Sequence, residues 1–175
     1  MEIIDQTIAA LKQINVPRYF TTERAFVTEF HHHLRNKIED IELFPPETIL
    51  ETEVQKRYND HFGVTQRPDL LIHIPIETGL TDNPDENNFV VYAFKRNGSL
   101  KPVRNDFKKL DIMFEKLNYN LGIFINIGAY PRSYLHVYQG SYKERIHEIT
   151  NILVDGNVYV KHACFQNNEV RIVEV

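Results

Sequence analysis

The sequence predicts a single α/β domain, spanning residues 1–175, in which helices pack on a mixed β-sheet. Its length is close to that expected for one domain. Short apolar runs typical of strands occur among segments whose apolar residues recur at helical spacing. The chain contains no internal repeat, low-complexity tract or linker-like segment. These observations favour one core, with helices covering the sheet.

Composition narrows the class of protein. Hydrophobic residues make up 42% and charged residues 25%, which is typical of a globular chain. The apolar runs are too short to span a bilayer, and the N-terminus lacks the basic region of a signal peptide. The single cysteine, Cys164, excludes an internal disulfide framework and a multi-cysteine zinc site. We therefore expect a cytoplasmic protein with no membrane partner.

The first third of the chain predicts two helices and a strand. Residues 3–14 carry apolar side chains at helical spacing, and Pro17 ends that helix. A second helix follows Thr21 or Thr22 as its cap, with an apolar residue at every fourth position from Phe26 to Ile38. Residues 48–58 alternate between apolar and polar, as a half-exposed strand does.

The middle of the chain predicts a hairpin followed by a helix. Residues 68–74 and 89–95 are short, strongly apolar strands, and residues 80–88 between them form an acidic loop. A helix is expected over residues 105–117, where apolar residues form one stripe.

The last third predicts further strands and one more helix. Strands are expected over residues 121–127 and 134–138, a helix over 142–152, and one or two strands over 158–175. The predicted order is therefore α–α–β–β–β–α–β–β–α–β.

The distribution of charge is more informative than its sum. The net charge of −4 does not by itself indicate a nucleic-acid binder. Between Lys95 and Lys109, however, six basic residues accompany a single acid, Asp106. Such a strip can track a phosphate backbone, or it can be solvated loop. The six are Lys95, Arg96, Lys101, Arg104, Lys108 and Lys109.

Two charged residues stand in the apolar strands of the hairpin. Because side chains alternate along a strand, Asp69, Leu71 and His73 share one face of the first strand. On the second strand, Val91, Ala93 and Lys95 share one face in the same way. A carboxylate in such a strand is costly to bury unless it binds something. Asp69 and Lys95 therefore form either a plain ion pair or part of a functional site.

The two strands together resemble the PD-(D/E)XK nuclease signature. In that family a Pro-Asp opens one hairpin strand, and an acid, any residue and a lysine end the next. Here Pro68-Asp69 matches the first part and Lys95 matches the lysine, but position 93 is alanine. The resemblance runs from about residue 21 to residue 127. It implies a restriction-endonuclease-like mixed β-sheet core flanked by helices, and it includes Asp106-Phe-Lys-Lys-Leu110 at the following helix.

The resemblance also implies a chemistry. Positions 69 and 93 would hold Mg²⁺ or Mn²⁺ with carboxylate oxygens, and Lys95 would orient or deprotonate the attacking water. Ala93 removes one of these ligands, so metal affinity should fall and turnover should be largely lost. Either the chain was deliberately inactivated, or it is a natural pseudonuclease that kept its binding surface. The retention of both Asp69 and Lys95 favours the first explanation.

Family members carry a further acid on the preceding helix, and two residues qualify here. Glu23 falls on the apolar stripe of the second predicted helix, whereas Glu29 lies in the phrase Phe-Val-Thr-Glu-Phe that the family's helix often shows. Glu53 on the following strand is a third candidate. Any of the three could equally be a surface carboxylate.

Other residues invite a functional interpretation more weakly. His31-His32-His33 point in three directions on a helix, so they cannot all bind one ion and are expected on its solvated surface. His73 either lines the site beside Asp69 or is a satisfied core histidine. Cys164 is assigned no role. Four tyrosines could stack on bases or pack in the sheet, namely Tyr119, Tyr130, Tyr134 and Tyr138.

The resemblance thus implies a metal-dependent nuclease, acting on DNA in restriction, repair or phage defence. DNA or RNA as the substrate, and endonucleolytic or exonucleolytic cleavage, stay open. No recognition module is evident, so target recognition would have to come from loops, from a second copy of the chain or from a partner protein. The alternative is a non-catalytic nucleic-acid-binding or assembly subunit that keeps the fold without the reaction.

Overall fold

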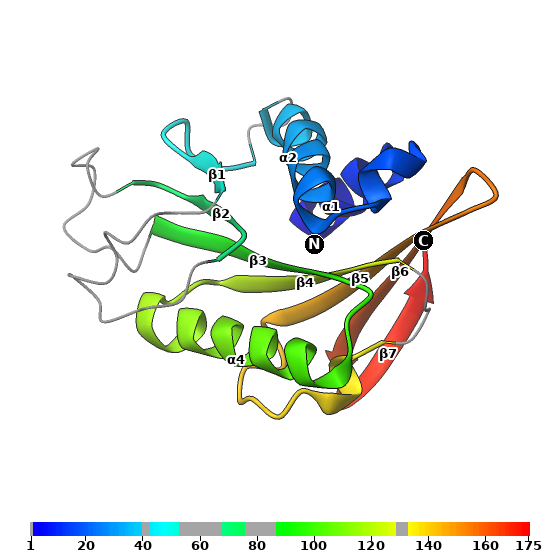
Figure 1. Cartoon of the computed structure of the whole chain (residues 1–175). Coiled ribbons are helices and arrows are strands. Elements are labelled where there is room, and N and C mark those ends of the chain that lie inside the picture. The colour runs from blue at the N-terminus through cyan, green and yellow to red at the C-terminus, as the bar shows by residue number, and fades with distance from the viewer. Residues whose placement is uncertain (1, 40–42, 53–67, 76–86, 129–132) are drawn as a thin grey trace.

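A computed structural model of the chain describes residues 2–39, 43–52, 68–75, 87–128 and 133–175. Within these residues the chain forms one seven-stranded mixed sheet, with helices on both of its faces (Figure 1). The strands lie in the sheet in the order in which they occur in the sequence. They are β1 (Ile49–Thr52), β2 (Leu70–His73), β3 (Asn88–Arg96), β4 (Leu121–Ile127), β5 (Ile146–Val154), β6 (Asn157–Gln166) and β7 (Glu169–Glu174).

The strand directions divide the sheet into three parts. β1, β2 and β3 form an antiparallel meander. β4 runs parallel to β3, β5 runs parallel to β4, and α4 (Leu100–Leu117) is the crossover between β3 and β4. β6 and β7 then return antiparallel to complete the sheet.

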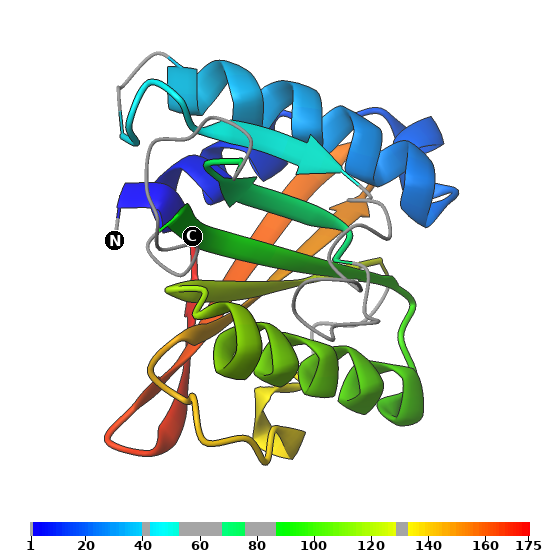
Figure 2. The same ribbon diagram turned by 90° about the vertical axis from the view of Figure 1, so that its left-hand side faces the viewer.

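Helices cover the two faces separately. α1 (Glu2–Lys12) and α2 (Glu23–Glu39) lie on one face, and α4 lies on the other (Figure 2). A short 3₁₀ helix, η1 (Pro17–Phe20), joins α1 to α2. The Thr22 hydroxyl accepts a hydrogen bond from the Ala25 N–H at 3.1 Å and so caps α2.

Alternation along β3 supplies both halves of the core. Tyr92 and Phe94 pack with Phe26 and Phe30 on the side of α1 and α2. Their neighbours on β3 point the other way and pack against the apolar stripe of α4. Both faces of the strand are therefore buried, which explains its nearly continuous apolar sequence.

Most predicted elements are confirmed. The two N-terminal helices, the antiparallel hairpin of β2 and β3, strand 121–127 and the closing strands 158–175 all form as expected. The helix predicted from residue 105 already begins at Leu100. Residues 53–58 of the first predicted strand and most of the acidic loop lie outside the described residues.

Two predictions in the last third are wrong. Residues 134–138 contain the 3₁₀ helix η4 (Leu135–Val137), and residues 146–154 within and beyond the predicted helix form β5. Ile146, Ile149 and Ile152 have helical spacing, but β5 is a central strand with both faces covered, so it lacks two-residue alternation. The Nδ2 of its buried Asn151 donates a hydrogen bond to the Leu11 carbonyl at 3.0 Å, whereas the Oδ1 of this residue has no hydrogen-bond partner among the described residues.

None of the helices in the described part of the chain is long and apolar enough to cross a membrane.

Candidate functional site

The start of β2 lies beside the end of β3, and this brings Asp69 next to position 93. Leu70 pairs with Tyr92 in antiparallel register, so Asp69, one residue earlier, lies across from Ala93. The Phe94 N–H donates a hydrogen bond to Asp69 Oδ2 at 2.8 Å. Directly opposed residues have Cβ atoms about 5 Å apart. An acid at position 93 would therefore stand beside the Asp69 carboxylate.

Lys95 lies two residues beyond Ala93 and contacts two acids. Its Nζ is 3.6 Å from Glu23 Oε1 and 3.4 Å from Asp106 Oδ2. Burial alone would lower the pKa of this ammonium, but attraction to Asp106 and Glu23 outweighs it and raises the pKa. Lys95 is therefore a firmly charged donor at neutral pH.

Glu23 is the helix acid that reaches this site. It lies at the start of α2, and its Oε2 accepts a hydrogen bond from the Arg96 N–H at 3.0 Å. Glu29, two turns further along, pairs instead with His33 at 3.2 Å. The apolar stripe of α2 therefore favoured Glu23, the acid that contacts Lys95. Glu53 lies outside the described residues.

The Asp69 carboxyl has a strongly perturbed pKa of about 6. Burial is the main cause, and the nearby Glu23 and Asp106 carboxylates raise it further. The hydrogen bond from Phe94 and the charge of Lys109 oppose these effects without cancelling them. A half-buried carboxylate with a raised pKa gains from a bound cation, because a cation favours its charged form.

Asp106 is a member of the site that the sequence did not single out. It lies on the buried side of α4, where Lys109 Nζ donates to its Oδ1 at 2.8 Å. Its Oδ2 faces Lys95 and has no hydrogen-bond partner. The signal was present in the sequence, because Asp106 falls on the apolar stripe between Val103 and Leu110, where an acid is costly.

The three carboxylates do not form a compact ligand set. Glu23, Asp69 and Asp106 each approach Lys95 or its neighbours, yet their oxygens are not gathered within 4.8 Å of one another as a group. Glu23 and Asp106 instead balance the charges of Lys95 and Lys109. Among the residues that the structure describes, Asp69 is the carboxylate of the three for which no ion pair with a lysine is seen. With alanine at position 93, it lacks the second acid of the motif.

Three of the six basic residues form one exposed face of α4. Lys101, Arg104 and Lys108 are exposed and lie three and four residues apart, so they share one side of the helix. α4 follows β3 after a short connection, so this stripe starts close to Lys95. The stripe offers positive charge beside the Asp69–Lys95 region.

The histidines considered from sequence lie away from this site. His73 is at the far end of β2 from Asp69, is buried, and hydrogen-bonds with Glu51 at 3.1 Å. Of the three consecutive histidines, His31 contacts the Leu50 carbonyl at 3.2 Å, His32 is exposed, and His33 pairs with Glu29. The three side chains therefore have separate environments.

The tyrosines considered for base stacking are committed to the fold. Tyr119 and Tyr138 are buried. Tyr134 is half-buried and donates its hydroxyl to the Gly98 carbonyl. Tyr130 lies outside the described residues. None of the three described candidates, Tyr119, Tyr134 and Tyr138, offers an exposed ring for base stacking.

No protein-family model, no curated protein and no solved structure matches this chain. Function is therefore inferred from the residues and their geometry. The arrangement is one half-buried aspartate with a raised pKa, one charged lysine that contacts two acids, and a small side chain across from the aspartate. Such a site can hold a phosphate and a water near Lys95, but it lacks a complete set of oxygen ligands for a hard metal ion.

Proposed function

We propose that the chain is a nuclease domain of the PD-(D/E)XK type that acts on DNA, and that alanine at position 93 leaves this chain without turnover. The observation that carries the proposal is the placement of Asp69 directly across from position 93, with Lys95 two residues further along the same strand. The order α2–β1–β2–β3–α4–β4, with the motif residues on β2 and β3, further supports it.

Position 93 is the one motif position that this chain fails to fill. Ala93 is 7% exposed and packs with Val91 and Leu71 below α4, so the strand tolerates it well. Mg²⁺ binds through several oxygen ligands and keeps near-octahedral geometry, and Asp69 alone cannot supply them. The residues present therefore do not fit a tight Mg²⁺ or Mn²⁺ site.

Lys95 is suited to bind phosphate and to position a water. Glu23 and Asp106 hold its ammonium charged and fix it at the end of β3. A charged ammonium offers three donors and no lone pair, so Lys95 would stabilise developing negative charge before it could accept a proton. Its two acidic partners would then act as positioning residues.

The stripe of Lys101, Arg104 and Lys108 supports a polyanionic substrate. A helix face with three exposed cations can neutralise successive phosphates of a duplex backbone, and it would do so without reading sequence. Target recognition would then require loops of this chain, a second copy or a partner protein. This requirement fits the roles in restriction, repair or phage defence that the resemblance implies.

A non-catalytic subunit is the second candidate function. The good packing of Ala93 favours it, because a natural pseudonuclease would keep the fold and the basic stripe while losing the acid. The nuclease and a nucleic-acid-binding subunit both predict DNA binding by the chain as it stands, whereas an assembly subunit does not. The two candidate functions differ in whether an acid at position 93 is sufficient for cleavage.

The experiment compares this chain with Ala93→Glu on supercoiled plasmid, linear DNA and RNA, in Mg²⁺ or Mn²⁺. Ala93→Gln is the matched control, because it adds the same volume without the charge. We expect Ala93→Glu alone to cut DNA, and circular dichroism to show that all three proteins are folded. Absence of cleavage by a folded Ala93→Glu on every substrate would leave the non-catalytic subunit as the function.

A further inference from the structure

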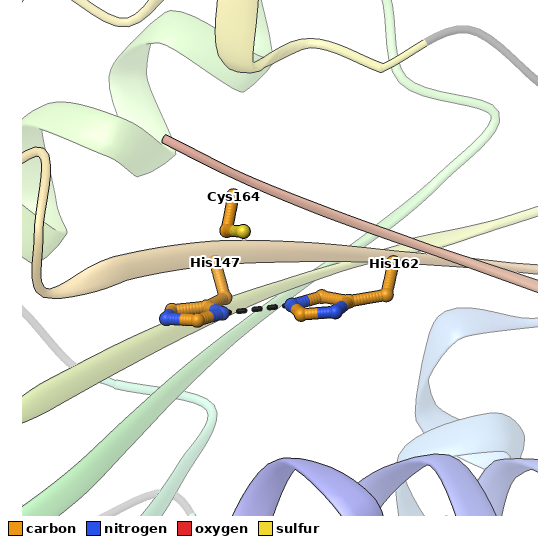
Figure 3. A group of neighbouring side chains, drawn as sticks. All are labelled: His147, His162 and Cys164. Carbon is orange, nitrogen blue, oxygen red and sulfur yellow. Dashed lines mark hydrogen bonds between the residues drawn. The ribbon is translucent and has the colours of Figure 1, made fainter. Parts of the chain in front are cut away.

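Three side chains with nitrogen and sulfur ligand atoms meet on β5 and β6. His147 on β5 lies directly across from Cys164 on β6, and His162 is two residues before Cys164 on the same strand. Residues two apart on a strand share a face, so all three side chains point to the same side of the sheet. Figure 3 shows the two imidazoles edge to edge, with the Cys164 side chain beside His147.

The ligand atoms are already close together. His147 Nδ1 lies 2.7 Å from His162 Nε2, and the two rings are nearly parallel, with an angle of 4° between their planes. One ligand atom from each of His147, His162 and Cys164 lies within 4.8 Å of the other two. Among the residues that the structure describes, these are the only three histidine, cysteine or acidic residues that meet this condition.

The distances between these ligand atoms, from 2.7 Å up to 4.8 Å, span the ligand–ligand distances of a tetrahedral zinc site. With Zn–N near 2.05 Å and Zn–S near 2.3 Å, neighbouring ligand atoms lie about 3.3 to 3.6 Å apart. The two imidazole nitrogens would therefore separate by about 0.6 Å to admit an ion. The ring that donates the present hydrogen bond would move its proton to its other nitrogen, so that both facing nitrogens carry lone pairs.

We propose that His147, His162 and Cys164 form a binding site for one Zn²⁺-class divalent ion. Two imidazoles and a thiolate would supply three ligands, and the fourth position would be open to water. Nitrogen and sulfur ligands select borderline and soft metals, so Mg²⁺ would not compete for this site. The site is distinct from the proposed nuclease site, because it lies on the α1 face of the sheet, two strands away from β3.

The surroundings favour this chemistry. All three side chains are half-buried, so an ion can enter while water is partly excluded. Burial lowers the pKa of His162, and burial together with His162 lowers that of His147 to about 4. Both rings are thus neutral, which is the form that binds metal. Asp5 on α1 lies near enough to His162 to act on its pKa in the opposite direction.

The experiment titrates the tag-free, metal-free full chain with Co²⁺ and follows its absorption, then displaces Co²⁺ with Zn²⁺. We expect one equivalent of Co²⁺ to produce the intense visible bands of a tetrahedral site, together with a thiolate-to-cobalt charge-transfer band. Binding should release one proton, from the thiol, because the imidazoles only change tautomer. Millimolar Mg²⁺ should leave the spectrum unchanged.

Cys164→Ser should remove the charge-transfer band, and His147→Gln and His162→Gln should each weaken binding at least about tenfold. His32→Gln is the matched control, because His32 is exposed on α2 and should leave binding unchanged. Circular dichroism checks that each variant is folded. A chain that shows no charge-transfer band, or binding that survives Cys164→Ser unchanged, would overturn the proposal.

Discussion

The Asp69–Lys95 region and the His147–His162–Cys164 cluster occupy the same sheet but offer opposite chemistries. The first presents carboxylates and an ammonium at the adjoining ends of β2 and β3. The second presents imidazoles and a thiol across β5 and β6. The first would suit a hard cation only with an acid at position 93, and the nitrogen and sulfur ligands of the second suit borderline metals. The two proposals therefore describe separate sites that would differ in the ions they prefer.

The largest expected effect tests this independence directly. In the Ala93→Glu background, Lys95→Ala should reduce Mg²⁺-dependent cleavage at least about a hundredfold, because it removes the charge that faces the phosphate. Cys164→Ser in the same background should cleave at an unchanged rate. Initial rates of plasmid nicking, measured with zinc removed, provide the comparison.

A fall in cleavage with Cys164→Ser as large as that with Lys95→Ala would break the comparison. It would mean that the two regions form one functional unit. The Co²⁺ spectrum supplies the reciprocal control, since Lys95→Ala should leave the spectrum unchanged.

The Asp69–Lys95 region could be predicted from the sequence, whereas the His147–His162–Cys164 cluster could not. Pro68-Asp69 and Lys95 belong to a motif whose two halves each occupy a few consecutive residues, and the sequence predicts both strands that carry these halves. The pairing of His147 with Cys164 depends on the register of β5 and β6 instead. Because residues 142–152 were predicted to be a helix, this register could not be anticipated. A lone cysteine then had no apparent partner.

The same contrast holds within the first region. Glu23 could be predicted, because the stripe of α2 turns it toward the sheet. The sequence motif that includes Asp106 assigns it no role, although the helical spacing places this acid on the apolar stripe of α4. Its contact with Lys95 depends on how α4 packs back on the sheet after the crossover. The periodicity of a sequence predicts which residues lie on the buried face of a helix. Only the tertiary fold shows which residues they contact.

A second prediction concerns the stripe on α4. Replacing Lys101, Arg104 and Lys108 together with alanine should weaken DNA binding at low salt for every sequence tested. Three phosphate contacts contribute about 2.7 to the slope of log affinity against log salt concentration, and the slope should fall by that amount. Fluorescence anisotropy at several salt concentrations measures it.

The control for the stripe is Lys161→Ala, which removes an exposed ion pair with Glu174 on β6 and β7. Its salt slope should match that of the unchanged chain. An unchanged slope in the triple variant would show that the stripe is solvated surface, and it would remove this support for a nucleic-acid substrate.

A third prediction separates the two helix acids. In the Ala93→Glu background, Glu23→Gln should lower the cleavage rate about tenfold, the lower range for groups that orient a functional residue. Glu29→Gln should have no effect on the rate, because Glu29 pairs with His33 away from the site. Equal rates for the two variants, measured at saturating Mg²⁺, would show that Glu23 does not position Lys95.

The smallest expected effect is on stability, and it has opposite pH dependence in the two regions. The pKa of Asp69 rises from 3.8 to about 6 on folding, so the folded state binds the proton more tightly than the unfolded state. Its contribution to stability therefore falls as pH rises from about 4 to 6. The pKa of His147 drops from 6.5 to about 4, so its contribution instead rises with pH over nearly the same range.

Asp69→Asn should therefore stabilise the metal-free chain at pH 7. The shift of about two units sets an upper bound near 3 kcal/mol, and partial exposure reduces the expected gain to about 1 to 2 kcal/mol. The gain should shrink toward zero as the pH falls through 3.8, below which Asp69 becomes protonated in the unfolded state as well. Urea unfolding at pH 4, 5.5 and 7 measures it, with the exposed Asp155→Asn as the matched control. Loss of stability at pH 7 would mean that the Asp69 carboxylate stabilises the fold through its hydrogen bond with Phe94. That result would count against a binding role, because a carboxylate that is retained at a cost to stability is what a binding site requires.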